Sequence, residues 1–473
     1  MASTQREREE KFEIADEVDV PDLVTLLPTG GRLERDTVRL HSTYYDTADG
    51  ALLRLRMTLR RREGDTDTGW HLKLPAGEAR TEVHVPLDGA DLPAELRGLV
   101  AGAAGDAPLV PVATIVTERR RQRLLVADGA LLLELADDRV AASRPDSPPT
   151  TWRELEVELG DAGSEKLLAR AADLLRGAGA SPAAAPSKLA RALGRQAPER
   201  RAGALQRYID QQVDALVAGD VALRRGENPV HATRVGTRRL RSTLRIFGAC
   251  FDPAAATALD GELAWYAGLL GEVRDREVLR ERFAAAVADL PAELVLGPVA
   301  EHLDTTLGAE QQAARDALLA EMSGERYRAL LATLATWSAG PPLTETGQQG
   351  DPVLRRSAET ATRKADTRLR QALRDGSDDE QLHRARKAAK RARYASELAA
   401  PVVGRKRATK AVKRYTRVQK VLGDQHDSVV AAEVLRRLAA QPAVGPCGFT
   451  FGVLHAREVA AAAAGRRTVA KLR

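Results

Sequence analysis

The chain has 473 residues, of which 72 are Lys or Arg, 66 are Asp or Glu and 44% are hydrophobic, enough for the cores of two or three domains. This composition excludes wholesale disorder and fibrous or collagen-like classes, and the two cysteines, Cys250 and Cys447, are too few for a disulfide framework. Because the first residues are charged and no apolar stretch of about 18 residues follows, we expect a soluble cytoplasmic protein without a membrane span.

Charge divides the chain into two parts. Residues 1–200 contain 28 basic and 34 acidic residues, a net charge of −6, whereas residues 201–473 contain 44 and 32, a net charge of +12. The pattern changes at the same place, from short alternating runs with turn residues to Ala, Leu, Arg and Glu at helical spacing. We predict a strand-rich domain over 1–196 and a helical domain over 204–473, with a linker between them.

The first part is predicted to form about eight strands. Besides the N-terminal Glu7-x-Glu9-x-Lys11, the candidates cover residues 37–46, 53–62, 70–74, 80–86, 114–126, 130–142 and 152–159.

Two of these candidate strands carry charge along one face. In residues 53–62 apolar residues alternate with arginines, and in residues 152–159 Glu154, Glu156 and Glu158 share a face. A charged face is usually the solvated side of an antiparallel sheet. Like charges crowded on several strands are costly, however, unless counter-charges face them. A closed barrel would let these faces meet around a polar tunnel suited to a metal ion carrying a phosphate chain.

Seven short motifs follow one another in the first part. They are Glu7-x-Glu9-x-Lys11, Tyr44-Tyr45-Asp46-Thr47, Thr58-Leu59-Arg60-Arg61-Arg62, His71-Leu72-Lys73-Leu74, Arg80-Thr81-Glu82-Val83, Glu154-Leu155-Glu156-Val157-Glu158 and Ser187-Lys188-Leu189-Ala190-Arg191-Ala192-Leu193. In this order the set resembles the CYTH domain of the triphosphate tunnel metalloenzymes. The resemblance implies an eight-stranded antiparallel barrel that binds a triphosphate with Mg²⁺ or Mn²⁺ in its tunnel.

The resemblance also implies roles for individual residues. The implied metal ligands are Glu7, Glu9, Glu154, Glu156 and Asp138. The implied catalytic set, which includes carboxylates that would hold a second metal or the attacking water, is Lys11, Glu154, Glu156 and Glu158. The implied triphosphate ligands are Lys11, Arg60, Arg62, Lys73, Arg80, Arg119, Arg121 and Lys188. Arg119 shares a strand face with Arg121, and Glu134 with Asp138, although a shift of one residue over 117–140 would exchange the faces.

The expected chemistry follows from charge. Hard divalent cations bridge phosphate oxygens and offset the negative charge that develops as the P–O bond breaks, while basic side chains hold the chain in line. Water is the expected nucleophile, so no Ser, Cys or His nucleophile is required. The sequence contains no GxxxxGK[ST], HExxH or CxxC motif, which excludes the usual rival phosphate and zinc schemes.

The second part contains an internal repeat. His231-x-x-Arg234-x-x-x-Arg238-Arg239-x-Arg241 matches His383-x-x-Arg386-x-x-x-Lys390-Arg391-x-Arg393, which lies 152 residues later. Leu270-Gly271-Glu272-Val273-Arg274-Asp275 matches Leu422-Gly423-Asp424-Gln425-His426-Asp427 at the same displacement. These matches predict a duplication, with repeats over about 204–350 and 351–473, and each repeat places a cationic ridge along one helix face.

A basic helix ridge is usually a solvated face. Residues 383–420, however, contain 14 Lys or Arg and one acidic residue. Repulsion between like charges one turn apart destabilises a helix, so this imbalance favours a bound anion. The ridges lack aromatic residues for base stacking, so we do not expect a nucleic-acid partner. This part is similar to the CHAD domain, which implies two helical bundles with pseudo-twofold symmetry and a basic groove for inorganic polyphosphate. The residues carried over by motif are His231, Arg234, Arg238, Arg239, Arg241, His383, Arg386, Lys387, Lys390, Arg391 and Arg393.

The sequence as a whole predicts an α+β multidomain protein, with an eight-stranded antiparallel β-barrel followed by an all-α domain of two pseudo-symmetric helical bundles. The leading hypothesis is a metal-dependent inorganic triphosphatase whose helical domain binds polyphosphate. One alternative is a non-catalytic polyphosphate-binding protein recruited to polyphosphate granules, and another is a nucleotide or thiamine triphosphate phosphohydrolase or a cyclase. The acidic tunnel residues favour catalysis, because a pure anion binder gains nothing from glutamates unless they hold metal.

Overall fold

The computed structural model describes residues 3–76, 79–89, 91–145, 147–194, 203–374 and 379–470. The chain forms two compact units, each built from more than one segment. The first unit comprises Met1–Ala202, Val217–Glu227 and Tyr327–Ala339, and the second comprises Gly203–Leu216, Asn228–Arg326 and Gly340–Arg473. None of the described helices is long and apolar enough to cross a membrane.

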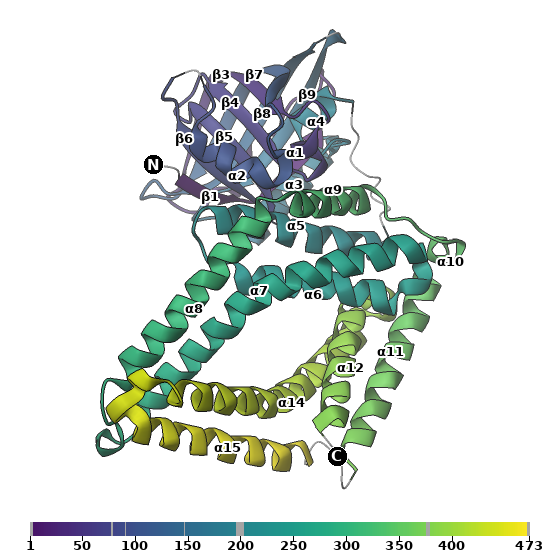
Figure 1. The fold of residues 1–473 in the computed structure, drawn as a ribbon. Coiled ribbons are helices and arrows are strands. Elements are labelled where there is room, and N and C mark those ends of the chain that lie inside the picture. The colour runs from purple at the N-terminus through teal and green to yellow at the C-terminus, as the bar shows by residue number, and fades with distance from the viewer. Residues whose placement is uncertain are drawn as a thin grey trace. The chain divides into compact units, whose positions relative to one another are not determined.

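The first unit is built on one antiparallel sheet (Figure 1). Its strands are β1 (Ser3–Glu7), β2 (Glu9–Glu13), β3 (Arg32–Asp46), β4 (Thr58–Glu63), β5 (Gly69–Ala76), β6 (Ala79–Pro86), β7 (Val110–Leu125), β8 (Leu131–Arg144), β9 (Ser147–Leu159) and the two-residue β10 (Ser181–Pro182). The hydrogen-bonded order is β1-β6-β5-β4-β3-β7-β8-β9-β2-β10.

The two ends of this strand order are joined through the chain itself. β1 pairs with β6 at one end and β2 pairs with β9 near the other, yet only Arg8 separates β1 from β2. The sheet must therefore curve so that its ends meet at Arg8. The antiparallel sheet is confirmed, whereas a closed barrel of eight strands is not, because the described strands form an open hydrogen-bonded order.

The apolar face of the sheet carries the core of this unit. Leu155 and Val157 of β9 are fully buried in a cluster that also contains Leu168 and Leu175 of α3 (Glu165–Gly177). Because side chains alternate along a strand, the three glutamates of β9 point to the opposite face. The charged face is thus turned away from the helix-covered core.

One predicted strand is wrong over part of its length. Residues 53–62 were expected to be extended throughout, but α1 (Ala51–Arg54) precedes β4, which begins at Thr58. The cause is the carboxylate of Asp46, whose Oδ1 accepts the N–H of Leu52 at 2.8 Å and whose Oδ2 accepts that of Leu53 at 3.0 Å. These bonds stabilise the helical turn at its N-terminus, which overrides the alternating pattern.

The second unit is helical. The helices of the chain are α1, α2 (Ala94–Ala104), α3, α4 (Lys188–Ala192), α5 (Ala204–Arg224), α6 (Val230–Ile246), α7 (Pro253–Ala288), α8 (Val299–Met322), α9 (Glu325–Ala339), α10 (Glu345–Gln348), α11 (Asp351–Ala372), α12 (Asp379–Leu398), α13 (Ala400–Val403), α14 (Arg405–Ala439) and α15 (Gly448–Ala470). Short 3₁₀ turns cover Leu23–Leu26, Gly248–Cys250, Ala292–Leu294 and Pro442–Cys447.

The helices of the second unit follow the internal repeat. The basic motif lies on α6 in the first repeat and on α12 in the second, and each is followed by one of the two longest helices, α7 and α14 (Figure 1). The far ends of these long helices share a core, in which Phe283 and Val299 pack with Leu435 and Phe451.

Candidate functional site

A cavity of about 310 Å³ lies on the charged side of the sheet in the first unit. It is lined by both basic and acidic residues. The basic lining residues are Lys11, Arg60, Arg62, Lys73, Arg119, Arg121 and Lys188. The acidic lining residues are Glu9, Asp65, Asp67, Glu82, Glu134, Glu156 and Glu158. The cavity therefore brings together residues from both ends of the domain's sequence.

The basic wall is carried by β4 and β5. Arg60 and Arg62 are buried, and their strand register places Arg60 beside Tyr44 and His71. Arg60 also lies 3.5 Å from the carboxylate of Glu82. The same carboxylate lies 2.9 Å from Nδ1 of His71. Burial alone would raise the pKa of Tyr44, but the nearby Arg60 and Arg62 lower it. This wall thus carries three cations, and Glu82 and Asp67 lie within 4 Å of them.

The acidic wall contains a row of glutamates on three neighbouring strands. Glu158 of β9 lies opposite Glu9 of β2 on one side and opposite Glu134 of β8 on the other. Burial, together with the charges of Glu9, Glu134 and Glu156, raises the pKa of Glu158 to about 7. Burial also raises the pKa of Glu134. Among the described residues, neither Glu134 nor Glu158 has a cation within 4 Å, whereas Glu9 lies 3.0 Å from Lys11, so two carboxylates of this row lack a close counter-ion.

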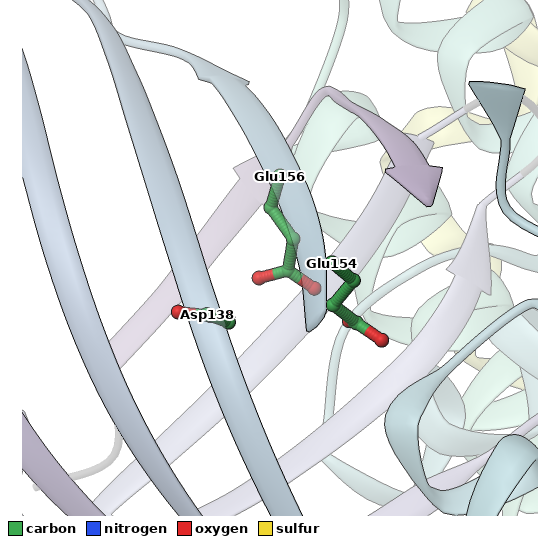
Figure 2. A group of neighbouring side chains, drawn as sticks. All are labelled: Asp138, Glu154 and Glu156. Atoms are coloured by element: carbon green, nitrogen blue, oxygen red, sulfur yellow. The ribbon is translucent and has the colours of Figure 1, made fainter. Parts of the chain in front are cut away.

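A second acidic group lies at the base of the wall, where Asp138, Glu154 and Glu156 have carboxylate oxygens within 4.8 Å of one another. Figure 2 shows Glu154 and Glu156 on β9, with the carboxylate of Glu156 extending toward Asp138 on β8. The Nζ of Lys188 lies 2.8 Å from an oxygen of each carboxylate. The Lys188 ammonium thus stands where a cation would be expected, and these carboxylates raise the pKa of Lys188 despite its burial.

Two further cations complete this end of the cavity. The guanidinium of Arg119 donates to both oxygens of Asp138 at 2.7 and 2.8 Å and to Glu156 at 2.7 Å. Lys11 contacts Glu156 and lies 3.0 Å from Glu9. Burial opposes ionisation of Glu156, but Lys11, Lys188 and Arg119 hold the pKa of its carboxyl well below the usual range.

The structure brings most of the predicted tunnel residues together. Arg119 and Arg121 share a face and line the cavity with Glu134, so the expected faces of β7 and β8 are correct at these positions. Asp138 and Glu154 are buried behind the lining rather than exposed in it. Two predicted residues, Glu7 and Arg80, are paired in register on β1 and β6, but their side chains lie outside the described part of the structure.

Several lining residues were not singled out from the sequence. Tyr44, His71 and Glu82 lie within quoted motifs, and the strand register explains their positions. His71 shares a face with Lys73, which is paired with Glu82, while Tyr44 is paired with Arg60. The sequence could have predicted these positions, because side chains alternate along a strand and the faces of Lys73 and Arg60 were already assigned to the tunnel.

In the second unit the two basic ridges face each other. Lys390 of α12 is largely buried and interacts electrostatically with Arg386 of its own helix and with Arg234 and Arg238 of α6. Burial and these three guanidinium groups lower the pKa of Lys390 to about 8. Arg238 and Lys390 are equivalent positions of the repeat, and they interact with each other. We call Arg234, Arg238, Arg386 and Lys390 the axial cluster.

Equivalent residues of the two repeats make similar contacts in the axial cluster. Arg234 lies over Gly271 of α7, where an added Cβ would meet its guanidinium at 3.3 Å, and Arg386 lies over Gly423 of α14 with the same 3.3 Å. Arg234 contacts Asp275 at 2.8 Å, and Arg386 lies 3.6 Å from the equivalent Asp427. The buried Nε atoms of Arg238 and Arg386 have no hydrogen-bond partner among the described residues.

The remaining predicted polyphosphate residues fall into two groups. His231, His383 and Lys387 are exposed beside the axial cluster. Arg239, Arg241 and Arg393 have carboxylate partners, namely Glu397 at 3.0 Å, Asp260 at 3.0 Å and Glu397 at 3.5 Å respectively. Arg391 lies with Arg245 in a separate cavity.

Comparison with known proteins agrees with this division. Residues 5–193 match the CYTH domain, and residues 207–436 match the CHAD domain. Two uncharacterized proteins of Mycobacterium tuberculosis, MT2285 of strain CDC 1551 / Oshkosh and Rv2226 of strain H37Rv, are each 35% identical over 482 residues, which cover 96% of this chain and 92% of theirs. The chain belongs to the family in which a CYTH domain precedes a CHAD domain.

Solved structures resemble parts of this CYTH–CHAD protein. PptA from Streptomyces chartreusis is 23% identical, with a TM-score of 0.47, over 57% of this chain and 95% of its own. The CHAD domain from the plant Ricinus communis is 28% identical, with a TM-score of 0.44, over 56% of this chain and 90% of its own.

Proposed function

We propose that the CYTH cavity hydrolyses inorganic triphosphate with Mg²⁺ or Mn²⁺ and that the CHAD domain binds polyphosphate. The supporting observation is that one cavity of about 310 Å³ holds a basic wall and an acidic wall. Guanidinium and ammonium groups of the first wall suit phosphate oxygens. Carboxylates of the second would only repel a phosphate chain unless a metal ion lay between them.

A divalent cation fits the row of Glu9, Glu158 and Glu134 better than the group around Lys188. Glu134 and Glu158 are half-buried carboxylates without a cation within 4 Å among the described residues, whereas Lys188 already balances Asp138, Glu154 and Glu156. Such an ion, when bound, offsets the charge that develops on the phosphate oxygens. Arg60, Arg62 and Lys73 would orient the phosphate chain, and Glu158 would hold the attacking water.

Polyphosphate binding is supported by the axial cluster. Four cations from two helices converge there, and burial together with the other three cations lowers the pKa of one of them, Lys390. A polyphosphate chain passing over it would supply the missing negative charge without needing aromatic contacts. Binding of this kind would also hold the protein on polyphosphate granules in the cytoplasm.

The deciding experiment is phosphate release from inorganic triphosphate, ATP and long-chain polyphosphate, each with Mg²⁺, Mn²⁺ or EDTA. We expect EDTA-sensitive release from inorganic triphosphate. Faster release from ATP or thiamine triphosphate would replace the proposed substrate, and formation of a cyclic nucleotide would identify a cyclase. Binding of long-chain polyphosphate without any hydrolysis would make the CYTH domain a receptor.

Matched variants on β2 test the assignment of the cavity. Glu9→Gln removes a lining carboxylate, while Glu10→Gln alters its neighbour on the opposite face, which pairs with Arg176 at 2.8 Å. We expect Glu9→Gln to lower turnover at least a hundredfold with an unchanged melting temperature, and Glu10→Gln to retain turnover. Equal activity in both variants would remove the tunnel from the mechanism.

A further inference from the structure

A second cavity, of about 300 Å³, lies in the CHAD domain between the end of α6, α11 and α12. We call it the α11 cavity. It is lined by the cations Arg245, Arg356, Lys364 and Arg391 together with apolar residues such as Ile246 and Ala388, and its lining contains no carboxylate. Arg356, Thr360 and Lys364 line it at intervals of four residues because they share one face of α11.

The internal repeat supplies a control for this cavity within the same chain. A cavity of about 380 Å³, the α5 cavity, lies between α5 and the end of α12. At the displacement of 152 residues, Thr360 corresponds to Tyr208 and Arg245 corresponds to Glu397, and all four residues line their respective cavities. The two cavities are therefore copies that have diverged in charge.

The α5 cavity contains its own anion. Glu397 accepts a hydrogen bond from Nε of Arg239 at 3.0 Å and from the hydroxyl of Tyr208 at 3.3 Å, and it lies 3.5 Å from Arg393. Arg239 is the counterpart of Arg391 in the repeat. In the α5 cavity, the carboxylate of Glu397 thus compensates the charges of both Arg239 and Arg393.

The α11 cavity lacks that anion, because Arg245 stands in the place of Glu397. The nearby Asp260 is fully used: one oxygen accepts from Arg241 at 3.0 Å and the other from Arg245 at 2.7 Å. Within the described residues, Arg391 and Lys364 have no hydrogen-bond or ion-pair partner. Burial and the charge of Arg245 lower the pKa of Arg391, and the charge of Asp260 offsets this only in part.

We infer that the α11 cavity binds a phosphate monoester with a small apolar body, at the position where Glu397 fills the α5 cavity. Guanidinium groups suit the planar pairs of phosphate oxygens, and Ile246 and Ala388 offer the apolar floor that inorganic polyphosphate would not use. The volume lies at the low end of small-molecule pockets. The inference does not depend on hydrolysis in the CYTH domain or on polyphosphate binding at the axial cluster.

Phenyl phosphate is a suitable probe, measured by titration calorimetry on the full chain in EDTA at low salt. The variant Arg356→Glu with Lys364→Glu reverses two exposed rim charges of the α11 cavity. The control, Arg207→Glu with Arg405→Glu, makes the same charge change at the α5 cavity. We expect the first variant to weaken phenyl phosphate binding at least tenfold and the control to weaken it less than twofold, with long-chain polyphosphate binding unchanged by the first variant.

A second variant converts the α11 cavity into a copy of the α5 cavity. Position 412, the counterpart of Asp260, is Val412, so Arg245→Glu with Asp260→Val reproduces the second-repeat arrangement. The introduced carboxylate should pair with Arg391 and Arg241 as Glu397 pairs with Arg239 and Arg393. We expect loss of phenyl phosphate binding with a melting temperature no lower than that of the native chain.

Three outcomes would overturn the inference. The first is equal weakening by the two charge-reversal variants, which would mean general electrostatic attraction. The second is phenyl phosphate affinity no greater than that of inorganic phosphate, which would remove the apolar floor from recognition. The third is a matching loss of long-chain polyphosphate binding, which would make the cavity part of the polyphosphate surface. Turnover of inorganic triphosphate, measured in parallel, reports separately on the CYTH domain.

Discussion

Lys188 is the residue on which the charge balance of the CYTH cavity depends most. Its ammonium lies 2.8 Å from each of three carboxylates, and its side chain is 9% exposed. A buried ion pair of this kind adds little net stability over an apolar replacement of the whole group. Removing only the cation is different, since Asp138 is fully buried and would be left with less compensation.

We therefore predict that Lys188→Met lowers the free energy of unfolding by about 3–5 kcal/mol at pH 7. The folded pKa values of Asp138 and Glu156 are lowered, so the stability they contribute is present at neutral pH and is lost as pH falls through those values. The deficit of the variant should shrink toward pH 4, where the carboxylates can protonate. Urea denaturation at several pH values measures it, with Lys166→Met at an exposed position of α3 as the control. A deficit independent of pH would contradict this account.

We predict that Lys390 makes the proposed polyphosphate binding dependent on pH. Its pKa is lowered to about 8, so the free protein loses this charge as pH rises through 8, and a polyanion must then restore the proton on binding. Polyphosphate affinity should fall by up to about tenfold between pH 7 and 9. Lys390→Arg, which stays charged, should abolish the fall, whereas Lys387→Arg on the exposed side of α12 should not. Fluorescence anisotropy with labelled polyphosphate measures both, and an identical pH response in the two variants would exclude Lys390.

At the scale of elements, a glycine lies beneath an arginine guanidinium in each of the two repeats. Gly423→Ala would place a Cβ 3.3 Å from the guanidinium of Arg386, which must then shift. Because alanine favours the helix over glycine by about 1 kcal/mol, we expect stability within about 1 kcal/mol of the native chain but severalfold weaker polyphosphate binding. Gly268→Ala on α7 is the control, since its Cβ would meet nothing within 4 Å and only stability should rise. Unaltered binding by Gly423→Ala would show that the position of Arg386 does not matter.

The elements also show what sequence patterns can and cannot predict. Alternation correctly placed Glu154, Glu156 and Glu158 on one face, because the period of a strand is fixed by its geometry. It failed at Leu53, where a side-chain carboxylate 7 residues earlier caps a helical turn. The repeat predicted two basic ridges, but their convergence at Lys390 depends on how α6 and α12 cross. The position of the Lys188 ammonium between three carboxylates likewise depends on contacts between residues that are more than 30 positions apart in the sequence. No local pattern contains such information.

At the scale of the whole molecule, the two domains carry opposite charge balances, and the phosphate sites that we propose for them are distinct. If turnover depends on the CYTH cavity and retention on the axial cluster, variants should separate the two functions. We predict that Arg238→Glu with Lys390→Glu weakens long-chain polyphosphate binding at least tenfold while turnover of inorganic triphosphate stays within twofold. Glu9→Gln should do the reverse.

The same two variants reveal whether the CHAD domain supplies substrate to the CYTH domain. If it does, the axial-cluster variant should reduce phosphate release from long-chain polyphosphate at concentrations far below saturation and leave release at saturation unchanged, because binding rather than chemistry would be lost. Phosphate release across a concentration series, with inorganic triphosphate as the short substrate, makes the comparison. Equal losses on short and long substrates would mean that the variant damages the fold, which circular dichroism melting would show independently. Unchanged phosphate release from both the short and the long substrate would mean that the axial cluster has no part in the hydrolysis of polyphosphate.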